Sequence, residues 1–87
     1  MAEPRLEEIG HIVRFFARPS AAVVALVAPL RVGDRLFIKG RTTDAEEEVR
    51  SLQVRHQAVT SAPAGTEVGI HVRAKCRPRD LVYRLVA

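Results

Sequence analysis

The chain has 87 residues, of which 47% are hydrophobic and 28% charged, and its formal net charge at pH 7 is +4. This size predicts one small domain with a modest core. The single cysteine, Cys76, excludes an internal disulfide framework, and the longest apolar run, residues 21–30, is far shorter than the ~20 residues of a membrane-spanning helix. We therefore predict a cytoplasmic domain with neither an export signal nor a membrane anchor.

Residues 1–7 show no periodicity, and we expect a frayed lead-in to a single domain over residues 8–87. The run 8–16 is rich in residues that favour strands. Gly10 inside this run predicts a bulge or a close approach of another backbone.

A hairpin is predicted next. Residues 17–20 form a turn, because Pro19 cannot donate to a strand ladder. Residues 21–27 are apolar throughout, which also fits a buried helix, but the short length and the valines favour a strand.

The stretch Leu-Arg-Val-Gly-Asp-Arg-Leu-Phe-Ile-Lys-Gly at residues 30–40 predicts a tight turn followed by a short strand. Gly33 supplies a positive φ at no steric cost, and Asp34 can bond to its own backbone. Leu36 and Ile38 alternate with polar neighbours, so they should face a core.

Residues 46–58 are the longest strand candidate. Three glutamates before Val49 and the three-residue step to Leu52 also fit a helix. We favour a strand with a bulge at residues 50–51, because apolar and polar residues alternate beyond it.

A turn at residues 61–66 separates this run from strands predicted at 67–73 and 81–86. Six strands with short polar connections and no convincing helix predict an all-β fold. We expect a small six-stranded closed β-barrel, because closure removes exposed sheet edges. The predicted core comprises Ile12, Val24, Leu26, Leu36, Ile38, Leu52, Val54, Val68, Ile70 and Val82.

Several short motifs, in the same order along the chain, resemble those of the β-barrel second domain of elongation factor Tu-type translational GTPases. They begin with Gly10-His11-Ile12 and continue with Leu-x-x-Gly-Asp-x-Leu-x-Ile at 30–38, Val-x-Ser-Leu-x-Val at 49–54 and Ala-x-Ala-Gly-x-x-Val-Gly-Ile at 62–70. The resemblance spans about Ile9 to Leu85. It implies a translation-protein barrel of the elongation-factor-like kind, related to free-standing barrels and to similar barrels fused behind collagenase-like peptidases. It also implies a tRNA- or ribosome-related partner.

Two departures from that family limit what is carried over. The chain has no Gly-x4-Gly-Lys-Ser/Thr loop, so we predict no binding or hydrolysis of GTP. Arg79 stands where the family has a glycine before Asp80.

The candidate catalytic and metal-binding groups are sparse. His11, His56, His71 and Cys76 come from separate predicted elements and show no metal-ligand spacing, so we predict no metal and no cofactor. Cys76 lacks a histidine and an acid at a spacing that suggests a triad. The glutamates at 46–48 could serve as a general acid or a divalent-ion site, but consecutive strand residues point to opposite sides and cannot readily converge on one substrate, so we expect a solvated negative face instead. We predict that the chain is not an enzyme.

A basic segment is the strongest functional candidate. Alternation places Arg73, Lys75, Arg77 and Arg79 on one side of an extended chain, a ladder that suits a phosphate backbone, with an ordinary soluble edge as the alternative. Arginine-rich composition fits phosphate contacts, and it also fits GC-rich coding. The residues proposed for nucleic-acid binding are Arg73, Lys75, Arg77, Arg79, Arg84 and Arg14.

Two predicted outward aromatics, Phe37 and Tyr83, offer surfaces for base stacking or for docking. The predicted function is therefore binding of RNA or a ribonucleoprotein. The alternative is a protein-interaction module that docks on a partner enzyme or GTPase through the outward apolar face of residues 21–27 and Phe37.

Overall fold

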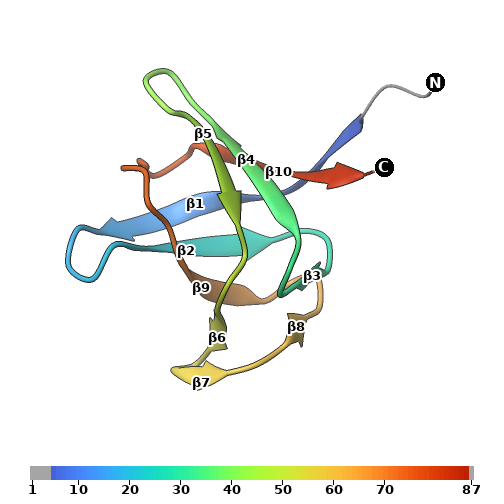
Figure 1. Cartoon of the computed structure of the whole chain (residues 1–87). Helices are drawn as coiled ribbons and strands as arrows, with labels where there is room; N and C mark the ends of the chain where they lie inside the picture. The colour runs from blue at the N-terminus through green and yellow to red at the C-terminus, as the bar shows by residue number, and fades with distance from the viewer. Residues whose placement is uncertain (1–4, 87) are drawn as a thin grey trace.

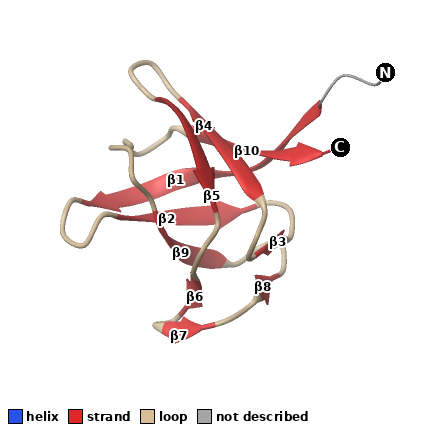
Figure 2. Ribbon diagram, viewed as in Figure 1, coloured by secondary structure: helices blue, strands red, loops and turns tan. Residues whose placement is uncertain are grey.

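The structure is a computed structural model that describes residues 5–86. Within this range the chain forms strands and loops without a helix (Figure 2), so the all-β prediction is confirmed. The strands are β1 (Arg5–Phe16), β2 (Ala21–Leu26), β3 (Leu30–Arg31), β4 (Arg35–Lys39), β5 (Asp44–Glu48), β6 (Leu52–Val54), β7 (Gln57–Ala58), β8 (Ser61–Ala62), β9 (Glu67–His71) and β10 (Leu81–Val86). Accordingly, residues 5–86 contain no helix long and apolar enough to cross a bilayer.

Eight strands form one antiparallel sheet in the order β5-β4-β10-β1-β2-β9-β6-β7, and β3 pairs with β8 in a second, two-stranded sheet. In Figure 1 the β4–β5 hairpin passes across the β1–β2 pair, so the large sheet folds back over its own core. Its two edges are β5 and β7, and neither sheet closes within the described residues. The predicted closed six-stranded barrel is therefore wrong in its closure and in its number of strands.

The strand predicted over residues 46–58 breaks into β5, β6 and β7. The break between β5 and β6 falls where the bulge was predicted, and buried Val49 and Leu52 lie on either side of it. Between β6 and β7, Arg55 and His56 adopt φ values of 52° and 65° and make a two-residue hairpin turn. Such turns usually carry asparagine or glycine, so the local sequence gave no signal for this one.

The amino-terminal strand starts earlier than predicted. Arg5, Leu6 and Glu7, expected to be frayed, pair with the last residues of β10. These partners come from the far end of the chain, where a local pattern cannot reveal them. Residues 1–4 of the predicted lead-in lie outside the described range.

The core follows the predicted alternation. All predicted inward residues are buried except Val54, which is half-buried, and further members include Ile9, Leu30 and Val49. Both features predicted at Gly10, a bulge and a close approach of another backbone, are confirmed. The β1–β10 register shifts between Glu8 and Gly10, and a Cβ at Gly10 would overlap the Ala25 carbonyl oxygen.

Candidate functional site

The predicted basic ladder lies in an irregular segment between β9 and β10, not on a strand. Arg73, Lys75, Arg77 and Arg79 are all exposed, and Cys76 among them is buried. The alternation of residues in the sequence correctly predicted that these four side chains are exposed. The segment is not an extended strand, however, so they do not line up along one side of it.

The other two arginines assigned to that surface lie elsewhere. Arg84 uses its guanidinium inside the domain, because Nη1 donates to the Pro29 carbonyl at 2.8 Å and Nη2 donates to Glu7 Oε1 at 2.6 Å. Asp34 Oδ2 lies 3.6 Å from Nη1. Arg14 is exposed on β1, in register with Val23 of β2. Arg84 thus fastens β10 to β1 and to the loop around residues 29–34.

The acidic run on β5 divides between the two faces of the sheet. Asp44 and Glu46 form ion pairs with Lys39 and Arg35 of β4. Glu47 is only 5% exposed, and its Oε2 accepts hydrogen bonds of 2.9 Å from the backbone N–H groups of residues 73 and 74. The predicted solvated face is wrong for Glu47, because it occupies an inward position opposite Leu36 in the β4–β5 register.

Cys76 is a buried free thiol. Burial and, to a smaller degree, the charges of Asp80 and Glu47 raise the pKa of Cys76 from 9.0 to about 11, so the thiol is protonated at neutral pH. A nucleophilic cysteine needs the opposite shift.

The three histidines do not converge. His11 lies on β1, His56 in the β6–β7 turn and His71 on β9, and all three are exposed. Within residues 5–86 no three or more histidine, cysteine or acidic side chains gather closely enough to hold a metal ion.

The predicted docking face is divided between two surfaces. Phe37 of β4 pairs with Tyr83 of β10, and both aromatic residues are half-buried on the outer side of that pair. Ala21 and Val23 lie instead on the outer side of β2, where they belong to a groove.

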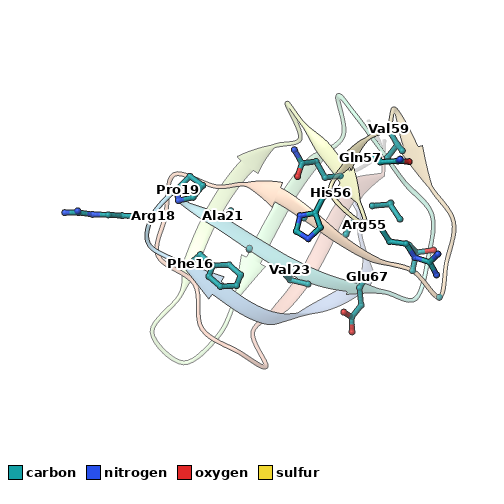
Figure 3. Close-up of a pocket in the computed structure, with 17 residues that line it drawn as sticks. Phe16, Arg18, Pro19, Ala21, Val23, Arg55, His56, Gln57, Val59 and Glu67 are labelled. Carbon is teal, nitrogen blue, oxygen red and sulfur yellow. The ribbon is translucent and has the colours of Figure 1, made fainter.

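This groove, of about 1030 Å³, lies over the outer side of β2 and β9 and is bounded by the β6–β7 hairpin (Figure 3). Phe16 and Pro19 border it at the β1–β2 turn, and His56 lies across from them. Ala21 and Val23 form its apolar floor. The Arg18 side chain points away from the groove.

The groove is wide because β9 carries no side chain at its centre. Gly69 lies between Val23 of β2 and Gln53 of β6 in the sheet, and a Cβ built on it would meet nothing within 4 Å. Sequence reasoning missed this site, because the groove depends on the β6–β7 hairpin. The one available signal was Gly69 inside an alternating strand, which can mark a site where a ligand or another backbone approaches.

The chain matches no protein-family profile. It is 39% identical over 79 residues to an uncharacterised protease of Methanocaldococcus jannaschii, a match that covers 90% of this chain and 19% of that protein. It is 31% identical over 78 residues to a collagenase of Porphyromonas gingivalis, with 87% of this chain and 22% of that protein covered. The chain thus spans about a fifth of the length of the curated relatives it matches.

These relatives overturn the resemblance to elongation factor Tu-type barrels. Proteins named protease and collagenase match the chain, so both the assignment to a translation factor and the RNA-binding function are wrong. The prediction that the chain is not an enzyme is overturned by the same names. The residues that suggested a translation factor are mostly turn glycines and core aliphatics, which serve a fold and not an activity.

Among solved structures, the C-terminal domain of a putative U32 peptidase from Geobacillus thermoleovorans superposes with a TM-score of 0.84 at 15% identity. The superposition covers 90% of this chain and 91% of that one. A selenomethionine variant of the same domain gives a TM-score of 0.83. The chain therefore shares its fold with the C-terminal domain of a U32 peptidase.

Proposed function

We propose that this chain works as a domain of a peptidase of the U32 and collagenase kind, and that it holds the polypeptide substrate in the groove over β2 and β9. The relatives named protease and collagenase support the link to peptide-bond cleavage. The observation that carries the binding role is the open apolar groove with a glycine at its centre.

A groove of this form suits a chain better than a compact small molecule. It is open to solvent, and its apolar floor is framed by polar groups from the β6–β7 hairpin and from Glu67. Apolar side chains of a polypeptide can be buried against Phe16 and Val23 at roughly 25 cal/mol per Å² of surface removed from water. The polar frame can hydrogen-bond to the polypeptide backbone.

The test fills the groove without disturbing the fold. Gly69→Val adds a β-branched side chain to a strand position with free space in front of it, so the variant should fold as well as the wild type. We expect the wild-type chain to bind gelatin, used here as an unfolded polypeptide. Gly69→Val should weaken this binding about tenfold or more, equivalent to losing ~1.4 kcal/mol of contact energy. Fluorescence anisotropy of the labelled chain measures both affinities.

The matched control is Thr42→Val, which adds a valine at an exposed position in the β4–β5 turn, outside the groove. It should bind gelatin as the wild type does, and thermal unfolding should show that both variants are folded. If wild-type protein does not bind gelatin, or if Gly69→Val binds as tightly as the wild type, the proposed function is wrong.

A further inference from the structure

The ladder between β9 and β6 stops halfway along β9. The two strands pair only at Leu52↔Ile70 and Gln53↔Gly69. Two more residues of the same antiparallel register would place Arg55 opposite Glu67. Arg55 instead begins the β6–β7 turn with a φ of 52°, so the chain leaves β9 at this point.

The backbone direction of Glu67 follows from its neighbours. Thr66 accepts a hydrogen bond of 3.0 Å from the Leu26 N–H, and Val72 donates one of 3.2 Å to Ser20, so the even-numbered residues of this segment face β2. The odd-numbered residues face the other way, because backbone groups of successive strand residues point to opposite neighbours. Accordingly, the Arg73 N–H bonds away from β2, to Glu47 at 2.9 Å.

The N–H and C=O groups of Glu67 therefore face the groove. Among the described residues, Glu67 has no strand partner on this side, and neither group bonds to the backbone of a turn or loop. Glu67, Val68 and Gly69 line one wall of the groove, and Val54 and Arg55 line the other. A short length of free sheet edge thus lies inside an apolar groove.

We propose that an extended polypeptide binds in the groove by strand addition at Glu67, exchanging two antiparallel backbone hydrogen bonds with its N–H and C=O groups. This inference rests on the proposed function and specifies how the substrate is held. Recognition through backbone groups is independent of side chains, so the ligand class is an extended segment of polypeptide and not a folded surface.

The groove also determines which side chains such a segment can carry. The space above Gly69, next to Val23, accepts an apolar side chain of the bound polypeptide. Alternate side chains of an extended segment point the other way, toward solvent. A bound segment can therefore bury one apolar side chain in this space while its neighbours stay in solvent.

The test removes a single backbone donor. Glu67→Pro lacks the N–H group, whereas Glu67→Ala keeps it and makes the same change of charge. Position 67 is the first residue of β9, where proline is compatible with a strand, and its N–H takes no part in the β2 ladder. We expect Glu67→Pro to bind gelatin about three- to tenfold more weakly than Glu67→Ala. The two variants should unfold at similar temperatures.

A second measurement uses the wild-type chain and does not depend on the proline variant folding. Hydrogen exchange followed by NMR should show the Glu67 amide becoming protected when gelatin is added. The Thr42 amide, in the exposed β4–β5 turn, should exchange at an unchanged rate.

The outcomes separate the two proposals. If Gly69→Val abolishes gelatin binding while the Glu67 amide stays unprotected, or while Glu67→Pro and Glu67→Ala bind equally, strand addition is wrong and the proposed function stands. If wild-type protein does not bind gelatin, both are wrong. Protection of the Glu67 amide supports strand addition even where the proline variant does not fold.

Discussion

The two ends of the large sheet are finished in different ways. At the β5 end, the buried Glu47 carboxylate accepts two backbone hydrogen bonds from the segment that follows β9, so it ties this end of the sheet to that segment. At the β6–β7 end, Glu67 keeps its backbone groups free and Gly69 faces open space. One end of the sheet is thus tied to a neighbouring segment by a side chain, and the other end keeps backbone groups available for a ligand.

A second carboxylate strengthens the β5 end of the sheet. Asp80 is 7% exposed, and its Oδ2 accepts a hydrogen bond of 2.9 Å from the Arg77 N–H. The Asp80 carbonyl accepts one of 2.8 Å from the Ile12 N–H, and Ile12 in turn accepts one from Arg79. The segment between β9 and β10 is therefore fixed to both β5 and β1.

The largest expected effect comes from removing the Glu47 carboxylate at the β5 end of the sheet. Glu47→Ala leaves the N–H groups of Arg73 and Ala74 without their acceptor in a partly buried place, which should lower the free energy of unfolding by roughly 2–4 kcal/mol. Urea denaturation measures it. The control is Glu46→Ala, an exposed ion-pair residue one position away, which should cost less than about 1 kcal/mol. Equal losses would mean that water replaces the Glu47 contacts.

The next comparison uses one glycine from each end. A Cβ at Gly40 would overlap the Asp80 carboxylate, so Gly40→Ala should cost roughly 1–3 kcal/mol. Gly69→Ala meets no atom and should be neutral or stabilising by up to about 1 kcal/mol, because alanine restricts the unfolded chain. Thermal unfolding of the two variants checks this, and a similar loss for both would remove the structural contrast between the ends.

The last expected effect appears only at alkaline pH. Because the pKa of Cys76 is raised from 9.0 to about 11 on folding, its contribution to stability is fully present below pH 9 and is lost as the pH rises through 11. The slope of unfolding free energy against pH in this window should be shallower in Cys76→Ala than in the wild type. Native protein should also react slowly with iodoacetamide at pH 8, and unfolded protein quickly. Rapid alkylation of the folded chain would show that the segment around Cys76 opens readily.

Alternation predicted much of the fold and little of the site. Leu36, Ile38 and Val82 point inward as expected, because strand periodicity depends only on local sequence. Whether the large sheet closes into a barrel could not be predicted, since closure depends on whether its edge strand β5 pairs with another strand. Glu47 was wrongly predicted to be solvated, because the backbone groups that hold its carboxylate in the interior lie more than 25 residues away in the sequence.

The groove was missed for a related reason. Arg55 and His56 take positive φ values that sequence patterns assign to glycine or asparagine, so the turn that opens the groove was hidden inside a predicted long strand. Arg79 behaves in the same way, with a φ of 78° at the position where a glycine was expected. The positions of basic residues were a weaker guide to a binding surface, because Arg84 forms hydrogen bonds within the domain.

The pairing of β1 with β10 has a mechanical consequence. It places the described ends of β1 and β10 side by side (Figure 1), since Arg5 is in register with Val86. Phe16, at the far end of β1, borders the groove. Any polypeptide joined at either end meets the domain at the same corner. Such an attachment leaves the opposite end of β1, and the groove that Phe16 borders, away from the junction.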